Sequence, residues 1–363
     1  MKVLFVEPFY GGSHRFFADR VAALSGHEVE LITLSAAFWK WRMRGAHLSL
    51  AAKIEERRGR FDRLLTTDML SLAELGGIMP WLAAVPSIVY FHENQLSYPV
   101  PKGEATDVHF GFTNISTALA ADRLVFNSRF HLEEFVGGVD PFLRARPDRR
   151  PRRLEERLRS KSAVVCPGVD SEELIRFRVA RRRGKPFTIL WNHRWEFDKC
   201  PEVFFRVLGR LAAAGLDFKV HLLGENFQVK PKPFLEAKEL LGERIATFGF
   251  LPAREEYVRA LWNSDVVVSP AVPEFYVFAG MEAACCGCRP LLPRRLAYPE
   301  LYGEECLYDG EEELEERLRQ FIAGGIAGRE EDDAPRSALA EEHDIRRSVR
   351  LLDRIIEETV SGE

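Results

Sequence analysis

Two kinds of hydrophobic pattern alternate along the chain. Short apolar runs rich in β-branched residues are typical of buried parallel strands, and stretches with an apolar residue every three or four positions are typical of amphipathic helices. The alternation predicts an α/β fold whose parallel sheets are covered by helices on both faces. The predicted strands are Val3–Val6, Val29–Thr33, Arg63–Thr66, Ile88–Phe91, Leu124–Asn127, Ala163–Cys166, Thr188–Trp191, Lys219–Leu223, Ile245–Phe248, Val266–Val268 and Pro290–Leu292. The predicted helices include Phe16–Leu24, Ile115–Ala121, Phe204–Ala214, Tyr257–Asn263, Tyr276–Cys286, Glu311–Ile322 and Leu339–Thr359.

The strand–helix series occurs twice, on either side of the polar, Arg-rich stretch Ala180–Lys185. A chain of 363 residues is long enough for about two domains. We therefore predict two Rossmann-like, doubly wound domains, residues 1–180 and 186–340, that face each other across a cleft. Residues 341–363 are expected to form a C-terminal helix that packs back on the first domain. The segment Gly324–Arg336 before this helix has the composition of a connection.

Composition narrows the class of protein. A hydrophobic fraction of 46% and a charged fraction of 29% are ordinary for a globular protein. No apolar run reaches the length of about 18 residues that predicts a transmembrane helix, and the N-terminus lacks the pattern of a signal peptide. The six Cys residues fit reduced thiols better than a disulfide framework or a zinc site, because Cys-Cys-x-Cys here has no nearby His. We expect a cytoplasmic protein without a membrane partner.

The stretch from Asp265 to Pro290 joins a buried strand to a helix with two glutamates. Glu274 precedes the helix and Glu282 lies inside it, so the two are at most about 12 Å apart along the helix axis. A helix N-terminus favours an anion, and the carboxyl edge of a parallel sheet is where α/β folds bind ligands. The pattern predicts a site for a sugar joined through a diphosphate to a ribose. Periodicity alone favours the alternative, two solvent-exposed glutamates.

Two polar segments follow predicted strands of the first half. Gly11-Gly12-Ser13-His14 allows close approach of the backbone to a ligand at a helix N-terminus, although a turn with a surface His is the common outcome for such a segment. His92-Glu93-Asn94-Gln95 places four polar side chains, each able to bond sugar hydroxyls, after an apolar run. A turn explains the Asn and Gln, and the His-Glu pair is the more informative part.

Further candidates lie in the second half and in a basic run. Arg194 and Lys199 could converge on one diphosphate, and salt bridges to Glu196 or Asp198 are the alternative. Gly224, after the next strand, offers a second turn for close approach to a nucleotide. The run of basic residues from Arg144 to Lys161 is either a solvated surface with intrachain partners or a contact for a nucleic-acid backbone.

Together these residues resemble glycosyltransferase family 4, retaining enzymes with the GT-B fold of two facing Rossmann-like domains. The shared pattern is Arg194 and Lys199 followed by Glu274-x7-Glu282. More narrowly, residues 2 to about 308 resemble the tRNA-queuosine α-mannosyltransferase family. The blocks that carry this closer likeness are Glu7–His14, Phe38–Arg42, Tyr90–Leu96, Val125–Ser128, Pro147–Pro151, His193–Lys199 and Glu282–Gly287.

The resemblance implies GDP-mannose as donor, queuosine in a tRNA anticodon as acceptor, and no metal cofactor. It gives the catalytic roles to His92 and Glu274 beside the transferred sugar and to Arg194 and Lys199 as a diphosphate clamp. Glu282 matches the residue that bonds the nucleotide ribose. The other expected donor contacts are Gly12, Gly224, Phe275, Tyr276 and Val277. The expected acceptor contacts are His14, Glu93, Asn94, Gln95, Arg149 and Arg150.

One position departs from the family pattern. Relatives usually have glycine where this chain has Val277, and a β-branched side chain there alters the loop that closes on the phosphate. Gly280, three residues on, would relieve part of the crowding.

Three functions remain open from the residues. The first is retaining, metal-independent transfer of mannose to queuosine; the chain has no Asp-x-Asp triplet, which agrees with a cationic clamp in place of a divalent metal. The second is transfer from another nucleotide sugar to a lipid or polysaccharide, with Phe38–Arg44 as a membrane patch. The third is a non-catalytic tRNA-binding protein in which Val277 abolished turnover.

Overall fold

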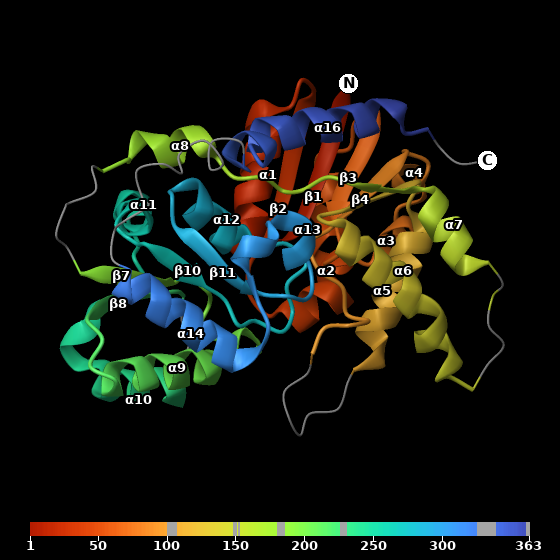
Figure 1. Ribbon diagram of the computed structural model, residues 1–363. Helices are drawn as coiled ribbons and strands as arrows, with labels where there is room; N and C mark the ends of the chain where they lie inside the picture. Colours follow the sequence, from red (N-terminus) through yellow and green to blue (C-terminus); the bar gives the residue numbers. More distant parts are fainter. Residues whose placement is uncertain are drawn as a thin grey trace. The chain divides into compact units, whose positions relative to one another are not determined.

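The computed structural model describes residues 1–99, 107–147, 151, 153–179, 186–225, 231–324 and 339–360 (Figure 1). The chain forms two compact units, Met1–Gly168 with Ile345–Glu363, and Val169–Asp344. The chain therefore passes between units after Gly168 and after Asp344, where the predicted domains ended at residues 180 and 340. The stretch Ala180–Lys185 and all but the first residue of Gly324–Arg336 lie outside the described residues.

Within the described residues, the first unit contains a parallel sheet of six strands in the order β2-β1-β3-β4-β5-β6. Alternate residues of the central strand β1 point to opposite faces, as strand geometry requires. Leu4 and Val6 pack under α2, α3, α5 and α6, while Val3 and Phe5 pack under α1 and α16. The strands are β1 (Lys2–Tyr10), β2 (Glu28–Ser35), β3 (Arg63–Thr67), β4 (Ser87–Phe91), β5 (Arg123–Phe126) and β6 (Ser162–Val164). The helices are α1 (Gly12–Leu24), α2 (Trp39–Glu55), α3 (Leu72–Ile78), α4 (Pro80–Ala83), α5 (Val108–Ala120), α6 (Arg129–Arg144), α7 (Leu154–Ser160) and α16 (Ile345–Glu358).

The C-terminal helix α16 belongs to the first unit by packing. Its apolar positions Ile345, Val349, Leu352 and Ile356 are buried against β1 and α1, and the Asp353 carboxylate accepts a hydrogen bond from the Gly26 backbone N–H at 2.9 Å. The predicted continuous helix Leu339–Thr359 is wrong in one respect, because the helix is interrupted just before α16. Asp344 forms a β-bridge with Val169 there, and an extended residue cannot continue a helix.

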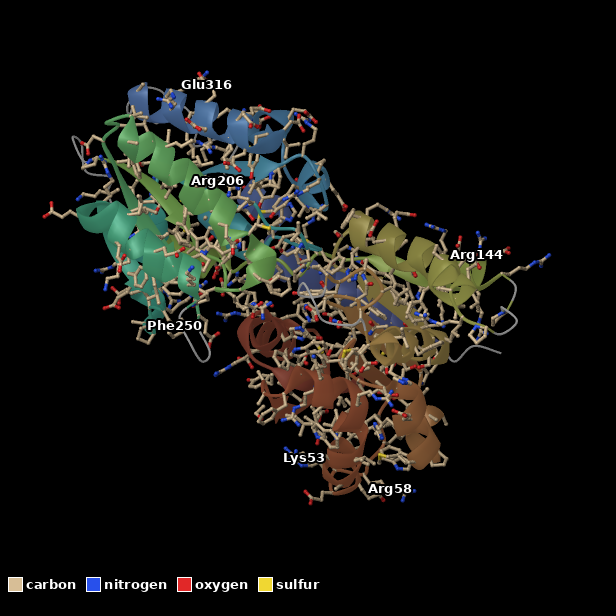
Figure 2. All side chains as sticks on the ribbon, turned by 90° about the horizontal axis from the view of Figure 1, so that it is seen from below. Lys53, Arg58, Arg144, Arg206, Phe250 and Glu316 are labelled. Carbon is tan, nitrogen blue, oxygen red and sulfur yellow. The ribbon has the colours of Figure 1, made fainter. Side chains whose placement is uncertain are left out.

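The second unit repeats the architecture. Its described residues contain six parallel strands in the order β12-β11-β10-β7-β8-β9. The strands are β7 (Phe187–Trp191), β8 (Phe218–Leu223), β9 (Ile245–Gly249), β10 (Val266–Val268), β11 (Arg289–Pro293) and β12 (Leu307–Tyr308). The helices are α8 (Ser171–Arg176), α9 (Pro201–Ala213), α10 (Lys232–Leu241), α11 (Arg254–Trp262), α12 (Phe278–Cys285), α13 (Tyr298–Leu301) and α14 (Gly310–Ala323), with 3₁₀ turns η1 (Phe197–Lys199), η2 (Gly242–Arg244) and η3 (Glu304–Cys306). Figure 2 shows the side chains of α9 and α14 facing each other near Arg206, which forms an ion pair with Glu311 at 2.8 Å.

The predicted α/β class and the parallel sheets are confirmed in both units. In each sheet the strand order reverses beside the first strand: β1 has β2 on one side and β3 on the other, and β7 has β8 on one side and β10 on the other. The crevice outside the carboxyl ends of the strands at such a reversal is where open α/β sheets bind ligands. Among the described helices, none combines the length and apolar character that crossing a membrane requires.

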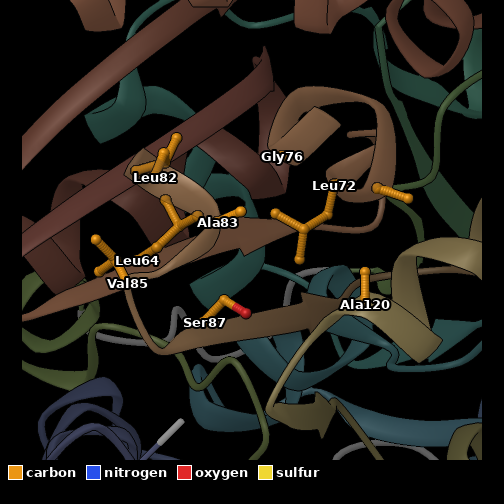
Figure 3. A pocket seen from close by; sticks show the side chains of 9 residues that line it. Leu64, Leu72, Gly76, Leu82, Ala83, Val85, Ser87 and Ala120 are labelled. Atoms are coloured by element: carbon orange, nitrogen blue, oxygen red, sulfur yellow. The ribbon is translucent and has the colours of Figure 1, made fainter. Parts of the chain in front are cut away.

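One surface pocket lies away from these carboxyl edges (Figure 3). Leu64, Leu82, Val85 and Ala120 line it, and Ser87, the first residue of β4, contributes a hydroxyl. A ligand site needs convergent polar groups, which this apolar lining does not provide. The carboxyl edges of the two sheets therefore hold the candidates for a functional site.

Candidate functional site

The strand reversal of the second unit carries a buried ion pair. Lys199 follows β7 in turn η1, and Glu274 follows β10. The Lys199 Nζ atom lies 2.8 Å from Glu274 Oε1, donates to the Pro273 carbonyl at 3.3 Å, and lies 3.5 Å from an Asp198 carboxylate oxygen. Burial alone would lower the pKa of Lys199, but Glu274 and Asp198 outweigh burial and raise it. The lysine is therefore a fixed positive charge in a largely buried site.

The Glu274 carboxyl is a weaker acid than an ordinary glutamate side chain. Burial raises the pKa of the Glu274 carboxyl, and the nearby Lys199 ammonium offsets only part of the rise. Arg194 lies close enough to interact electrostatically with both residues, while its own NH1 atom lies 3.3 Å from Glu196 Oε1. The structure thus brings Arg194, Lys199 and Glu274 together, and the alternative salt bridges to Glu196 and Asp198 coexist with this cluster.

Glu282 is held in a second network on the same unit. It points inward from α12 with an exposed fraction of 2%, and its carboxylate accepts hydrogen bonds from the Arg254 guanidinium and, at 3.0 Å, from the Tyr257 hydroxyl. Asn192, just after β7, donates to the Tyr257 hydroxyl at 3.2 Å and to the Ala279 carbonyl at 2.8 Å. Since Asn192 sits between the strand end and α12, it ties this network to the carboxyl edge of the sheet.

The loop between Glu274 and α12 is packed inward. Phe275, Tyr276 and Val277 are all buried, and the Tyr276 hydroxyl lies 3.4 Å from His343 Nδ1. Helix α12 begins at Phe278, two positions later than the predicted Tyr276, with Val277 as its N-cap residue. Gly280 faces Val277: a Cβ atom added there would lie 2.7 Å from Val277 Cγ1. The missing side chain at residue 280 accommodates the valine at residue 277.

The backbone around residue 224 requires a glycine. Its φ of +153° is a conformation that L side chains rarely adopt, and an added Cβ would lie 2.0 Å from the His193 carbonyl oxygen. The loops that follow β7 and β8 therefore approach each other closely at this glycine. The other residues of the predicted turn, from Asn226 on, lie outside the described residues.

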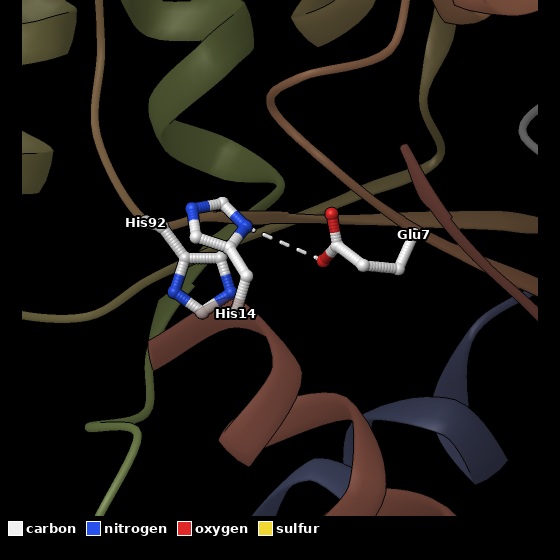
Figure 4. Close-up of side chains that lie close together, drawn as sticks. All are labelled: Glu7, His14 and His92. Carbon is white, nitrogen blue, oxygen red and sulfur yellow. Dashed lines mark hydrogen bonds and ion pairs between the residues drawn. The ribbon is translucent and has the colours of Figure 1, made fainter. Parts of the chain in front are cut away.

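In the first unit the corresponding edge carries a buried carboxylate and two adjoining imidazoles whose planes are tilted by 38° (Figure 4). Glu7, in β1, accepts hydrogen bonds from the Phe9 backbone N–H at 2.8 Å and the Thr67 hydroxyl at 3.2 Å. Its other oxygen lies 3.4 Å from His14 Nδ1, and the rings of His14 and His92 have centroids 4.0 Å apart. Gly12, with φ of +53°, opens α1 two residues before His14.

The two imidazoles carry different charges. Burial alone would lower the pKa of His14, but the Glu7 carboxylate outweighs it and raises this pKa to about 8. Burial, together with the positive charge of His14, places the pKa of His92 well below its ordinary value. Burial also raises the pKa of Asp68 to about 8, although His14 opposes the rise. At neutral pH His14 is an imidazolium beside a neutral His92, whose buried Nε2 atom has no hydrogen-bond partner among the described residues.

In the segment after β4, some polar groups are hydrogen-bonded within the turn and other side chains remain partly exposed. The His92 backbone N–H donates to Asp68 Oδ1 at 2.8 Å. Asn94 is buried, and its Oδ1 accepts from the Leu96 backbone N–H at 3.0 Å, so this side chain builds the turn. Gln95 donates from Nε2 to Glu93 Oε1 at 3.1 Å, and both side chains remain partly exposed.

A divalent cation is chemically compatible with part of this cluster. One ligand atom each from Glu7, His14 and His92 lie within 4.8 Å of one another. A carboxylate and two imidazoles are a donor set used by zinc enzymes. Glu7 and His14 already pair with each other, however, and a metal would have to displace the His14 proton.

Replacing Glu7 by Gln tests the assigned charge of His14. Gln keeps an oxygen that accepts from Phe9 and Thr67 but removes the negative charge, so the pKa of His14 should fall from about 8 to 6.5 or below. A folded-state pKa raised above 6.5 means that the pair stabilises the fold below pH 6.5 and that this stabilisation is lost as pH rises through about 8. NMR titration of ¹³Cε1-labelled His measures the pKa directly. Glu93→Gln is the control, with a much smaller shift expected, and an unchanged His14 pKa in Glu7→Gln would contradict the assignment.

Some arginines of the basic run from Arg144 to Lys161 form ion pairs within the chain. Arg159 forms a two-point ion pair with Glu133 at 2.7 and 2.8 Å, and Arg144 pairs with Asp140. These two arginines are thus satisfied within the chain. Arg149 and Arg150, the residues expected to contact the acceptor, lie outside the described residues.

Residues of these clusters that were not among the predicted site residues include Glu7, Asp68, Arg254 and Tyr257. Glu7 stands in a segment with family likeness, and its position inside an apolar strand is a signal of a buried, paired charge. Arg254 and Tyr257 lie in α11, whose predicted counterpart Tyr257–Asn263 left Arg254 out. Only the packing of α11 against α12 reveals their contact with Glu282.

The fold of the chain matches that of several solved structures. Sucrose-phosphate synthase from Thermosynechococcus elongatus superposes with a TM-score of 0.74 at 12% identity, covering 99% of each chain. The Anabaena protein HepE in complex with UDP gives 0.69 at 14% identity, covering 98% of this chain and 100% of the other. A glycosyltransferase from Rickettsia africae gives 0.71 at 15% identity, covering 100% and 99%. The fold is therefore that of the GT-B glycosyltransferases.

Sequence comparison specifies the family. The model for the N-terminal part of tRNA-queuosine alpha-mannosyltransferase matches residues 2–169. The tRNA-queuosine alpha-mannosyltransferase of Drosophila melanogaster is 39% identical over 330 residues, which cover 88% of this chain and 86% of the relative. The chain belongs to the tRNA-queuosine alpha-mannosyltransferase family, and the resemblance found in the sequence is confirmed.

Proposed function

We propose that this protein transfers mannose from GDP-mannose to queuosine in a tRNA anticodon, with retention of configuration and without a metal cofactor, in the cytoplasm. The observation that carries the proposal is the buried Lys199–Glu274 pair beside Arg194 at the strand reversal of the second unit, in a chain of this family. A fixed cation in a dry site stabilises negative charge far better than one in water. The departing diphosphate is the group that develops such charge.

The donor would bind at the carboxyl edge of the second sheet. Lys199 and Arg194 would contact the diphosphate, and Glu274 would meet the mannose hydroxyls. Glu282, already oriented by Arg254 and Tyr257, would accept hydrogen bonds from the ribose hydroxyls. A carboxylate held by two donors keeps its orientation without further loss of side-chain entropy when a sugar binds.

In the reaction the bond between the anomeric carbon of mannose and the β-phosphate oxygen breaks, and a bond from that carbon to the queuosine hydroxyl oxygen forms on the same face. The hydroxyl proton passes to the departing phosphate oxygen, so charge and atoms balance without a covalent enzyme intermediate. Arg194 and Lys199 stabilise the leaving group. Burial and the charge of His14 keep His92 neutral. Its Nε2 atom would accept a hydrogen bond from the transferred sugar or donate one to it.

The deciding experiment follows radioactive mannose from GDP-mannose into purified tRNA. We expect incorporation into tRNA that contains queuosine, none into the same tRNA with guanosine at that position, and no loss of activity in the presence of EDTA. The anomeric configuration of the product, read by NMR, tests retention. Equal labelling of both tRNAs would overturn the acceptor assignment, and labelling from a UDP-sugar but not from GDP-mannose would overturn the donor assignment.

A further inference from the structure

An unusual surface lies where β2 leads into α2. We define the aromatic–basic surface as Phe38, Trp39, Lys40, Trp41, Arg42 and Arg44. Phe38 is 81% exposed, Trp41 56% and Trp39 36%. Single exposed apolar side chains are common, but three large rings within four residues mark an interaction site.

The rings are held outward by the backbone. Phe38 has φ of +55°, a left-handed conformation that a bulky residue rarely adopts. The turn is fixed because the Phe38 carbonyl accepts hydrogen bonds from the Trp41 and Arg42 N–H groups at 2.8 and 3.0 Å. The Arg42 guanidinium closes the other side by donating to the Ser35 carbonyl at 3.1 Å. This exposure is therefore built into a rigid turn.

Helix α2 is basic over all but its last residue, Glu55. Between Trp39 and Ile54 the helix contains Lys40, Arg42, Arg44 and Lys53 and no acidic residue, in a chain whose net charge is −4. The Lys40 ammonium lies over the Trp39 ring, 5.6 Å from its centroid. Cations interleaved with exposed aromatic rings are complementary to a polyanion whose bases can stack.

This surface is continuous with the His14–His92 cluster of the same unit. An added Cβ at Gly11 would lie 2.3 Å from the Ala36 Cβ, so the turn before His14 touches the segment that leads to Phe38. Trp39 packs on Phe110, with ring centroids 5.2 Å apart. Phe110 shares an apolar cluster with Phe9, whose ring meets His14 edge-on at 5.7 Å. A ligand that binds the exposed rings can therefore extend to His14 with the part of the ligand next to the bound one.

We propose that the aromatic–basic surface binds the single-stranded anticodon loop of the acceptor tRNA. Bases next to queuosine stack on Phe38 and Trp41, and the flanking phosphates contact Lys40 and Arg44. This inference rests on the proposed function and assigns a binding surface to its acceptor. Unpaired bases offer π faces to aromatic rings, which is how single-stranded RNA is held by proteins.

A lipid bilayer is the competing occupant, and the distribution of apolar residues disfavours it. Helices that lie in a membrane interface keep an apolar stripe along their length. In α2 the exposed apolar side chains concentrate in the first turn, with Leu48 the exception, while Met43, Leu50 and Ile54 are buried. A short patch of rings suits a few bases better than a bilayer.

The test measures binding of the full-length protein to a fluorescent hairpin that carries the anticodon stem and loop. Removing one stacking ring should weaken binding about tenfold, so Phe38→Ala and Trp41→Ala should each raise Kd by that factor. In the transfer assay the KM for tRNA should rise in parallel, and the KM for GDP-mannose should not change. Phe250→Ala is the matched control, because Phe250 is 61% exposed on the other unit (Figure 2).

The charged residues are tested by salt dependence. Each phosphate contact contributes roughly 0.7 to the slope of log Kd against log salt for a single strand. Lys40→Ala and Arg44→Ala should each reduce the slope by about this amount. Lys232→Ala, at an exposed lysine of the second unit that pairs with Glu236, should leave it unchanged.

The outcomes separate this inference from the proposed function. Unchanged hairpin affinity in both Phe38→Ala and Trp41→Ala would overturn the proposed RNA-binding role of the surface. The same conclusion would follow if these variants lost binding to anionic vesicles while their binding to the RNA hairpin stayed intact. Phe38→Ala should fold like the wild type, because the Phe38 ring is mostly exposed to water and its removal costs little packing. If the wild type binds the hairpin through these rings yet transfers no mannose, the surface stands and the enzymatic proposal fails.

Discussion

Replacing Lys199 by Met should lower mannose transfer by about 10³-fold, because it removes a preorganised cation from the site where leaving-group charge develops. Met preserves the length and apolar character of the side chain. Lys199 Nζ is within 2.8 Å of Glu274 and 3.5 Å of Asp198, so the substitution also leaves two carboxyl groups without their cation. Breaking a buried pair in this way costs about 3–5 kcal/mol of stability.

A double variant separates lost chemistry from lost stability. In Lys199→Met/Glu274→Gln one of the two uncompensated carboxylates is replaced by a neutral amide. The free energy of unfolding, measured in urea, should therefore return much of the way to the wild-type value, while mannose transfer stays low. Lys232→Met, at an exposed lysine, is the control and should leave both measurements unchanged. If Lys199→Met kept more than a tenth of the wild-type kcat, the proposed role of this cation would be wrong.

Replacing Gly280 by Ala should destabilise the second unit although alanine is the better helix former. The new Cβ would lie 2.7 Å from Val277 Cγ1 and 3.3 Å from the Tyr302 hydroxyl. Overpacking a stiff β-branched residue costs about 1–3 kcal/mol, whereas the intrinsic helix preference returns at most about 1 kcal/mol. Thermal unfolding measures the net loss, and a weaker thermal shift by GDP reports the effect on the adjoining donor loop.

The clash with residue 277 should disappear in a Val277→Ala background, where the Cβ atom of that residue would be 3.7 Å away and the closest contact would be the Tyr302 hydroxyl at 3.3 Å. In Val277→Ala the further change Gly280→Ala should therefore be neutral or stabilising. The resulting coupling energy should reach about 2 kcal/mol, which is typical of residues in contact. Additive effects of the two substitutions would show that Gly280 does not accommodate Val277. Gly209→Ala, in helix α9, gives a control glycine whose added Cβ would meet a leucine methyl at 3.0 Å.

The glutamate stretch shows how far sequence reasoning extends. A buried β-branched strand, a loop and a helix with Glu274 and Glu282 were predicted, and β10 is found at the predicted residues, with α12 beginning two positions later. These features are local, because strand and helix periodicity is written in consecutive residues. The partners of the glutamates are not local. Arg254 reaches Glu282 from a helix 28 positions away in sequence, which only the packing of the unit decides.

The first unit shows the same division. Its sequence indicated that Gly12, His14 and His92 follow parallel strands, and hence lie at one edge of a sheet. The positive charge of His14 and the neutrality of His92 depend on burial and on the distance from Glu7 to His14, neither of which a sequence contains.

By itself the sequence determined the α/β class, the strands that the apolar runs predict, and the family, because each depends on residue types in fixed order. Tertiary structure alone decided the points at which the chain passes between units, including the bridge from Asp344 to Val169 that interrupts the last predicted helix. It also decided that Gly280 makes room for Val277 and that the rings of Phe38 and Trp41 face water. Each of these outcomes depends on which surfaces meet in space, and hydrophobic patterning leaves that to packing.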